Sequence, residues 1–377
     1  KERKYMKFTI DKNIILENLM NVARAISTKN VIPVLNGIKF EMTEEGLYLT
    51  ASDSELTIKS FIEKKDIKNV EALGNIIIQS KFILDIIRKM PSDIIDFEVV
   101  DGLKIKLTSG SSECSLNCLD SSEYPQIDLE EHKTPIYINS MLFKSIVSQT
   151  AFAISTQELR PLLTGLNFKI TGDILECIAT DSYRLAKKTV TLNGASDNDV
   201  NMVIPGKNVL ELDKIINDDV DMELHVFSNK VLFKYKNIIF QSNLLAGNYP
   251  NTNNLIPTNF EYMMSTNLDD FYNAIDRASL VTQSKDKNIV KMTLSGKKLI
   301  INSYASEIGK VEETIDVECN VENDISISFS AKYMLEALKT FKDEKIMILL
   351  NGDIKPIVIK STEDETLIQL ILPIKTY

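Results

Sequence analysis

The chain carries three copies of one sequence unit. PVLNGIKF at 33–40 returns as PLLTGLNF at 161–168, and ASDSELTI at 51–58 returns as ATDSYRLA at 179–186. Both pairs are 128 residues apart. Two motifs that recur at one spacing are typical of a repeat architecture. The fold is therefore expected to consist of similar units in series.

A second landmark places all three copies. A β-rich run, a turn of small residues, a lysine and an apolar helix pattern occur together at 75–90, 201–216 and 324–341. The lysines in these runs are separated by 126 and 125 residues.

The patterned sequence starts at Met6, and this spacing predicts three domains of normal size. Their predicted boundaries are 6–129, 130–256 and 257–377.

Each predicted domain contains two similar halves. MKFTIDKNIILENLMNVARAIS at 6–27 reads as a short strand followed by an amphipathic helix, and 75–90 repeats that plan. Short alternating strands follow each helix. The pattern predicts an α+β fold with a β-α-β-β-β order twice per domain, in which antiparallel sheets pack on helices. If such chains associate head to tail and the rotation closes, they form a ring.

Composition limits the cellular setting and the chemistry. No apolar run of the 377 residues approaches the roughly 20 residues that cross a bilayer, so a cytoplasmic protein is expected. The four cysteines are scattered without a second ligand pair, so no metal site is expected. The sequence has no P-loop, GxGxxG or HExxH motif, and no cofactor is expected. His132 and His225 lie in unrelated contexts and are interpreted as a surface and a strand histidine.

Several stretches together resemble the bacterial DNA polymerase III beta subunit, the sliding clamp family. They are the opening MKFTIDKNIILENLMNVARAIS, the PVLNG and PLLTG turns, ATDSYRLA, SFSAKYMLEAL and the ending LILPIKTY. The resemblance runs from Met6 to Tyr377. It implies a DNA-clamp fold and a head-to-tail homodimeric ring, with helices lining the hole and sheets outside. It also implies a processivity subunit with no catalytic centre of its own.

The resemblance further implies that duplex DNA is encircled without sequence readout. The net charge of −10 argues against nucleic-acid binding by ordinary phosphate contacts. A ring that encircles DNA needs only weak contacts, which removes this objection. Candidate DNA-facing residues, from the inferred helices and the STKN loop, are Arg24, Lys29, Lys81, Arg88, Lys89, Lys144, Lys207, Lys214, Arg277, Lys332 and Lys339. Acidic residues share these helices, so ordinary solvated charges remain the alternative.

In this family, the clamp loader, the replicative polymerase and other proteins dock a short peptide in a groove near the junction of the second and third domains. The resemblance places the groove at Arg160, Leu163, Thr180, Ser182, Tyr183, Arg184, Leu185, Pro250, Asn254, Leu255, Ser330, Tyr333, Ile354, Pro356, Leu370, Ile371, Leu372, Pro373 and Ile374. Apolar members would provide desolvated pockets, and Arg160 and Arg184 would hold polar groups at the rim.

The chain departs from the family pattern at two places. Ser182-Tyr183 stand where the family commonly has Gly-His, and Asn254 stands where some relatives have arginine. Within the chain, the first copy has Glu55-Leu56-Thr57 where the second has Tyr183-Arg184-Leu185. This asymmetry favours one peptide site per chain.

Two other functions remain as alternatives. ATDSYRLA contains Asp181 and Ser182, but neither histidine lies in a recognisable nucleophile motif, so an enzyme is disfavoured. Asp181 is interpreted as a turn or strand-end residue and not as an acid catalyst, because Asp53 occupies the same place in the first copy. The other alternative is a repeat-built scaffold that binds proteins and does not encircle DNA.

Overall fold

The structure is a computed structural model of the chain. It describes residues 5–27, 30, 32–101, 103–131, 134–194, 199–282, 288–320 and 323–375.

Six α-helices and 26 β-strands occur among the described residues. The first third of the chain contains β1 (Lys7–Asp11), α1 (Lys12–Val22), β2 (Gly37–Met42), β3 (Gly46–Ser52), β4 (Leu56–Glu63), β5 (Ile67–Ala72), β6 (Gly74–Gln79), α2 (Ser80–Lys89), β7 (Ile94–Val99), β8 (Lys104–Ser109) and β9 (Ser112–Asn117). The middle contains β10 (Ile136–Asn139), α3 (Ser140–Thr150), β11 (Gly165–Thr171), β12 (Ile174–Thr180), β13 (Arg184–Thr191), β14 (Val200–Pro205), α4 (Gly206–Ile215), β15 (Asp221–Val226), β16 (Lys230–Tyr235) and β17 (Ile238–Asn243). The last third contains β18 (Tyr262–Asn267), α5 (Leu268–Ser279), β19 (Ile289–Ser295), β20 (Lys298–Ala305), β21 (Gly309–Asp316), β22 (Glu318–Cys319), β23 (Ile325–Ser330), α6 (Ala331–Leu338), β24 (Lys345–Leu350), β25 (Ile357–Ser361) and β26 (Leu367–Ile371).

The predicted β-α-β-β-β order is confirmed in all six places. Two strands, β5 and β22, were not predicted. Both follow the last strand of a first half, and each pairs with the strand that opens its third of the chain, β5 with β1 and β22 with β18. They therefore extend a sheet at the opening strand and leave the repeated order intact.

The chain divides into two compact units. Unit 1 is residues 1–141 and 211–244, and unit 2 is residues 142–210 and 245–377. Unit 1 contains a sheet of order β5-β1-β7-β8-β9 and a sheet of order β10-β15-β16-β17-β4-β3-β2-β6. Unit 2 contains the orders β14-β11-β12-β13-β26-β25-β24-β18-β22 and β21-β20-β19-β23.

The two longer sheets join strands from different sequence copies. In unit 1, β17 pairs with β4, with Ser242 opposite Leu56. In unit 2, β13 pairs with β26, with Arg184 opposite Ile371. Each junction pairs the last strand of a first half with the last strand of a second half. Pairing in this way covers edge strands that would otherwise expose unpaired backbone groups.

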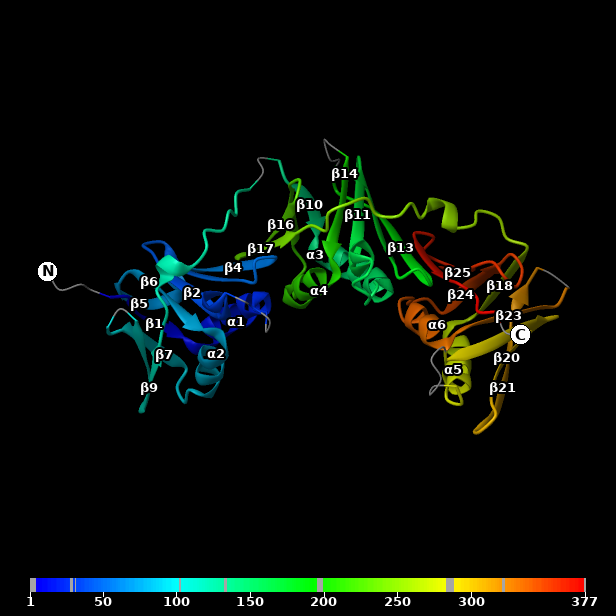
Figure 1. Cartoon of the computed structure of the whole chain (residues 1–377), viewed down its shortest axis with the longest axis horizontal. Helices are drawn as coiled ribbons and strands as arrows, with labels where there is room; N and C mark the ends of the chain where they lie inside the picture. Colours follow the sequence, from blue (N-terminus) through cyan, green and yellow to red (C-terminus); the bar gives the residue numbers. More distant parts are fainter. Residues whose placement is uncertain are drawn as a thin grey trace. The chain divides into compact units, whose positions relative to one another are not determined.

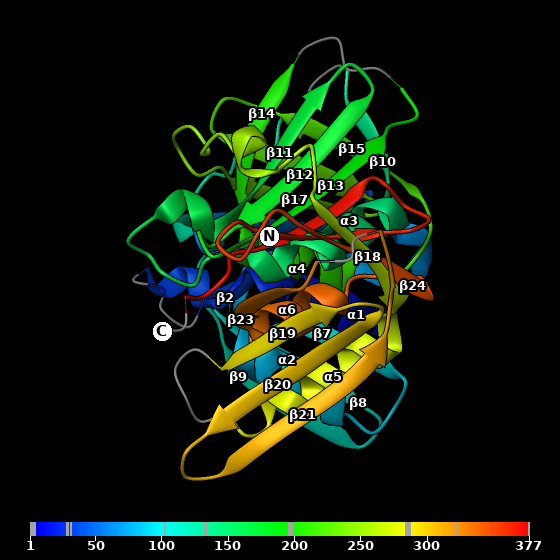
Figure 2. The ribbon, with the colours of Figure 1, turned by 90° about the vertical axis from the view of Figure 1, so that its right-hand side faces the viewer.

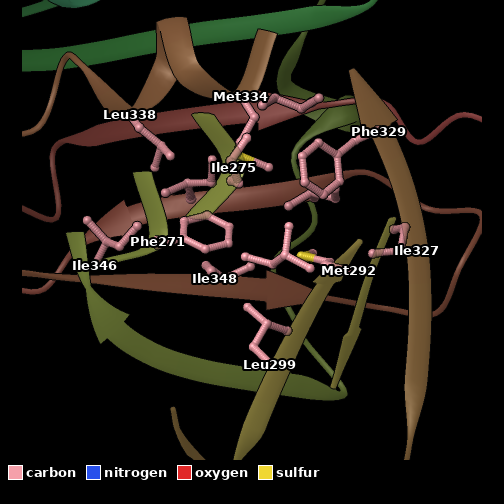
Figure 3. Packing of buried hydrophobic residues seen from close by; sticks show 14 of the residues in the cluster. Phe271, Ile275, Met292, Leu299, Ile327, Phe329, Met334, Leu338, Ile346 and Ile348 are labelled. Atoms are coloured by element: carbon pink, nitrogen blue, oxygen red, sulfur yellow. The ribbon is translucent and has the colours of Figure 1, made fainter. Parts of the chain in front are cut away.

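The helices bury one apolar face against the strands. In unit 2, Phe271 and Ile275 of α5 and Met334 of α6 pack with Met292 and Phe329 of the strands, all at most 2% exposed (Figure 3). Helix α5 packs beside α6, as α1 does beside α2 in unit 1 (Figure 1). Figure 2 shows β19, β20 and β21 side by side with α5 against them.

The PVLNG and PLLTG turns need glycine because a neighbouring strand lies too close to leave room for a side chain. A Cβ on Gly165 would lie 2.6 Å from the carbonyl oxygen of Ile204 and 2.8 Å from Cγ1 of Val203. Gly37 meets Ile77 and Ile78 in the same way. These repeated turns are therefore structural markers of the strand pairs β11–β14 and β2–β6. Among the residues described above, no helix is long and apolar enough to cross a membrane.

Candidate functional site

The segment ATDSYRLA forms the tight turn between β12 and β13. Oδ1 of Asp181 accepts hydrogen bonds from the backbone N–H groups of Tyr183 (2.9 Å) and Arg184 (3.0 Å). In the first copy, Oδ1 of Asp53 accepts from Glu55 (3.0 Å) and Leu56 (2.7 Å). The prediction that Asp181 is a turn residue is thus confirmed, because its carboxylate closes the turn in both copies.

The backbone of this turn is left-handed at one residue in each copy. Ser182 has φ +79° and Ser54 has φ +76°. Glycine occupies that region without strain, whereas serine does so at a cost. Ser182 therefore keeps the conformation that a glycine would adopt there, and its hydroxyl accepts a hydrogen bond from Nη1 of Arg160 at 3.0 Å.

A cavity of about 540 Å³ opens beside the turn in unit 2. Six predicted groove residues line it: Arg160, Leu163, Thr180, Ser182, Pro250 and Leu255. Pro161, Leu162 and Thr252 also line it and were missed. The sequence did contain a signal for them, since Pro161 and Leu162 belong to the repeated PLLTG motif and Thr252 lies between two predicted residues.

Arg184 does not have the predicted rim role. Its side chain is only 9% exposed, and its Nε lies 3.0 Å from Oδ2 of Asp181. Nη1 pairs with Glu336, and the guanidinium carbon lies 4.4 Å from the ring centroid of Tyr333 and 5.2 Å from that of Phe152. The guanidinium of Arg184 thus contacts two carboxylates and two aromatic rings, so its side chain supports the turn from the interior of unit 2.

Four other predicted groove residues are also structural. Leu185 and Leu370 are 2% and 4% exposed and pack together in a small buried cluster with Val358. Ile371 is fully buried in the main core of unit 2. The Ser330 hydroxyl caps α6 by accepting from the N–H of Tyr333 at 3.5 Å. In the structure these side chains pack within unit 2 and support the elements around the cavity.

The C-terminal tail lies against the same turn. The N–H of Leu372 donates to the carbonyl of Tyr183 at 2.9 Å, and the N–H of Ile374 donates to the carbonyl of Ser328 at 2.7 Å. Leu372 is 38% exposed and Tyr183 is 59% exposed, whereas Pro373 is half-buried. The tail therefore adds apolar surface next to the turn.

Asn254, Ile354 and Pro356 also lie outside the cavity lining. Asn254 is exposed, Ile354 is 63% exposed in the loop before β25, and Pro356 is half-buried in that loop. The Ile354–Pro356 loop leads directly into Ile357, whose partner in the sheet is Ile371. These residues stay candidates for contacts outside the cavity.

Two half-buried phenols border the turn. The Tyr249 hydroxyl accepts from the N–H of Thr180 at 3.1 Å, and burial raises the pKa of Tyr249 above its ordinary value. Burial also raises the pKa of Tyr333, whose ring lies 6.5 Å from that of Tyr183. Tyrosine is uncharged near neutral pH even at its ordinary pKa, and the shift keeps both phenols neutral to higher pH.

Most of the candidate DNA-facing residues lie on helices. Lys81, Arg88 and Lys89 are exposed on α2, Lys207 and Lys214 on α4, Arg277 on α5, and Lys332 on α6, with Lys339 directly after α6. Arg24 lies in a 3₁₀ turn (Ala23–Ala25), and Lys144 is half-buried on α3. Lys29 lies outside the described residues.

Several of these cations already contact acidic side chains. Glu211 pairs with both Arg24 (3.1 Å) and Lys214 (2.7 Å). Arg88 pairs with Asp85 at 3.5 Å, and Arg277 pairs with Glu313 at 2.8 Å. The positive charge of the set is thus partly neutralised.

Comparison with known proteins accounts for the whole chain. Three family descriptions match in series: DNA polymerase III beta subunit, N-terminal domain, at residues 6–128; central domain, at 137–251; and C-terminal domain, at 253–375. The chain is 41% identical over 379 residues to the beta sliding clamp of Bacillus subtilis (strain 168), covering 99% of this chain and 100% of that protein.

Solved structures agree with the sequence comparison. The crystal structure of the DNA polymerase sliding clamp from Bacillus subtilis superposes with a TM-score of 0.96 at 40% identity, covering 99% of this chain and 100% of the other. The DNA polymerase III beta chain from Streptococcus pneumoniae TIGR4 gives 0.95 at 35% identity, covering 98% and 100%. The predicted α+β clamp fold is confirmed.

Proposed function

The chain belongs to the DNA polymerase III beta subunit family, and from this premise we propose how it closes its ring, holds DNA and binds its partners. The family function is that of the sliding clamp, which confers processivity on the replicative polymerase in DNA replication and is not itself an enzyme.

The ring is a head-to-tail dimer joined through β9 and β21. Within the chain, the last strand of a first half pairs with the last strand of a second half at β4–β17 and again at β13–β26. One strand of each kind remains, β21 and β9, and each ends its sheet. Pairing β9 with β21 of a second chain repeats the same junction and closes a ring of two chains.

Exposed apolar side chains near these two edges support the dimer. Leu103, 52% exposed, precedes β8, and its carbonyl accepts from the N–H of Cys118 just after β9 at 2.8 Å. Tyr304 and Ile308, 68% and 61% exposed, flank the turn into β21, and Leu280 after α5 is 61% exposed. An edge strand rimmed by large apolar groups is a surface that a partner strand covers.

Duplex DNA passes through the ring along the helices. Lys81, Lys89, Lys332 and Lys339 are exposed on or directly after α2 and α6 and supply weak phosphate contacts. Arg24, Arg88 and Lys214 contribute less because neighbouring carboxylates offset their charge. Arg277 is reassigned to a local role, since its bidentate pair with Glu313 holds β21 against α5.

Each chain binds one partner peptide beside the turn at 180–184. The observation that carries this assignment is the cavity lined by Leu163, Pro250 and Leu255, with the tail held against the same turn. A pocket with apolar walls and a few polar rim groups takes an apolar anchor side chain. Arg160 at the rim is 3.0 Å from Ser182 and can also hold a carbonyl or carboxylate of the peptide.

In the first sequence copy, side chains of the chain itself pack together at the corresponding turn. Val34, Leu35, Ile77 and Tyr124 form a buried cluster, and Leu119 and Ile127 pack on it. In the second copy, Leu255 stays 52% exposed. This difference supports one groove per chain.

The partners are the clamp loader, the replicative polymerase and other proteins that carry clamp-binding peptides, and the setting is the cytoplasm. The three domains are 6–129, 130–256 and 257–377, with the boundaries placed by the repeat and supported by the family matches.

Retention on DNA tests the encircling ring. The chain is loaded by a clamp loader onto nicked circular DNA, and half of the sample is then linearised. Retention on the circle with release from the linear form is expected, because a ring without strong contacts leaves only through an end. Equal release from both forms would contradict encirclement.

A further inference from the structure

Three side chains of unit 1 with metal-binding groups converge on one another. Glu223 and His225 are two residues apart on β15, so their side chains lie on one face of the strand. Glu131 comes from the segment between β9 and β10. One oxygen from each carboxylate and one ring nitrogen of His225 all lie within 4.8 Å of one another.

We propose that Glu131, Glu223 and His225 bind a divalent transition-metal ion, with Zn²⁺ as the best match. One imidazole and two carboxylates are a donor set that Zn²⁺ accepts, with water in the fourth position. Mg²⁺ and Ca²⁺ prefer oxygen ligands alone, so the histidine selects against them. Donor atoms on a tetrahedral ion with bonds near 2 Å lie about 3.3 Å apart, so atoms within 4.8 Å of one another need to close by no more than about 1.5 Å.

The site already holds a positive charge supplied by the chain. Nζ of Lys234 lies 3.1 Å from Oε2 of Glu131 and 3.9 Å from Oε2 of Glu223. Lys234 stands opposite Glu223 in the β15–β16 pair. The cluster is therefore arranged to hold a cation.

Lys234 can give way to the ion. Its side chain is 37% exposed, so the ammonium can move into water when a divalent ion takes its place. His225 is only 1% exposed, and its Nε2 lies 3.2 Å from Oε2 of Glu223. The buried imidazole of His225, the strand carboxylate of Glu223 and the exposed carboxylate of Glu131 then close on the ion.

The bound ion would fasten the segment before β10 to the sheet. Lys230 already holds this segment through the carbonyl and the carboxylate of Asp128, both at 2.8 Å. Glu131 is the member of the metal set that belongs to the same segment. Occupancy of the site is thus expected to protect residues 127–131 from proteolysis.

Titration of the chelator-stripped full chain with ZnCl₂ tests the site by calorimetry. One ion per chain is expected. Glu131→Gln is expected to weaken binding at least tenfold, since even outer-shell metal partners are worth about 10- to 100-fold. Lys234→Gln is expected to tighten binding because it removes the competing ammonium. Asp128→Asn is the matched control, because Asp128 holds the same segment but lies outside the metal set, and its affinity is expected to match that of the unaltered chain.

Glu131 is exposed, so its replacement does not disturb the core. Limited proteolysis gives a second readout: Zn²⁺ is expected to slow cleavage within 127–131 in the unaltered chain and not in Glu131→Gln. Absence of Zn²⁺ binding, or equal affinity in the unaltered chain and Glu131→Gln, would overturn the proposal, the second result meaning that zinc binds elsewhere on the surface.

Discussion

Leu163 gives the sharpest test of the peptide groove because the repeat provides its control. Leu163 lines the cavity of unit 2 and is 4% exposed. Leu35 holds the same place in the PVLNG copy, is 2% exposed, and packs with Val34 and Tyr124. Leu163→Ala and Leu35→Ala therefore remove the same atoms from two similar turns, and only one of them faces the cavity.

The expected loss of affinity follows from the atoms removed. Leucine to alanine removes three carbons, each worth about 0.8 kcal/mol when buried. Leu163 is only 4% exposed in the free chain, so a bound anchor meets only the face of the side chain that lines the cavity. With about half of the transfer free energy as the upper limit, the expected loss is at most about 1.2 kcal/mol, or about sevenfold in Kd.

Fluorescence anisotropy with a labelled clamp-binding peptide measures this loss of affinity. Thermal unfolding of both variants measures their stability. Both substitutions are expected to destabilise their units by about 2–5 kcal/mol, and only Leu163→Ala should weaken peptide binding. Unchanged affinity in Leu163→Ala would refute the cavity as the binding site. An equal loss of peptide affinity in Leu35→Ala would show that the effect comes from destabilisation of the chain and not from the cavity.

Three further predictions concern the dimer, the tail and the buried arginine. Leu280→Asp is expected to shift the dimer towards monomer in sedimentation velocity, whereas Leu73→Asp, 42% exposed and next to the far edge strand β5, should leave it intact; equal behaviour of the two would contradict the β9–β21 interface. Removal of residues 373–377 deletes the Ile374–Ser328 hydrogen bond and is expected to weaken peptide binding without dissociating the dimer, and unaltered anisotropy would argue against the tail as part of the groove. Arg184→Met leaves Asp181 and Glu336 without their cation and should cost about 3 kcal/mol of unfolding free energy in urea titration. Arg184→Met combined with Glu336→Leu should recover part of that free energy. If Arg184→Met is as stable as the unaltered chain, the ion pairs of Arg184 contribute nothing to stability.

Sequence reasoning predicted the order of elements well because the periodicity of each copy is local. The strand–helix–three-strand order follows from apolar spacing and turn residues, and three copies reinforce one another. The strands β5 and β22 were missed because each is stabilised by pairing with a strand distant in sequence. Local patterns carry no information about such partners.

The candidate site was predicted less evenly. The turn role of Asp181 was visible because Asp53 repeats it. The predicted rim role of Arg184 was wrong. The burial of the Arg184 side chain depends on Glu336 and Tyr333, which lie about 150 residues further along the chain. Arg184 follows Tyr183, and the sequence alone suggests that both side chains are exposed to solvent. Only the packing of α6 shows that Arg184 is buried.

The sequence by itself determined the threefold repeat, the alternation of helices and short strands, and the turns that glycine and aspartate close, because these depend on residues near one another in the chain. Only the tertiary structure decided which edge strands meet within the chain, so that β9 and β21 remain at the ends of their sheets. It also decided which members of ATDSYRLA face the cavity. Strand pairing and burial depend on groups that the fold brings together from distant positions, so the same local motif encloses a filled cluster at Leu35 and borders an open cavity at Leu163.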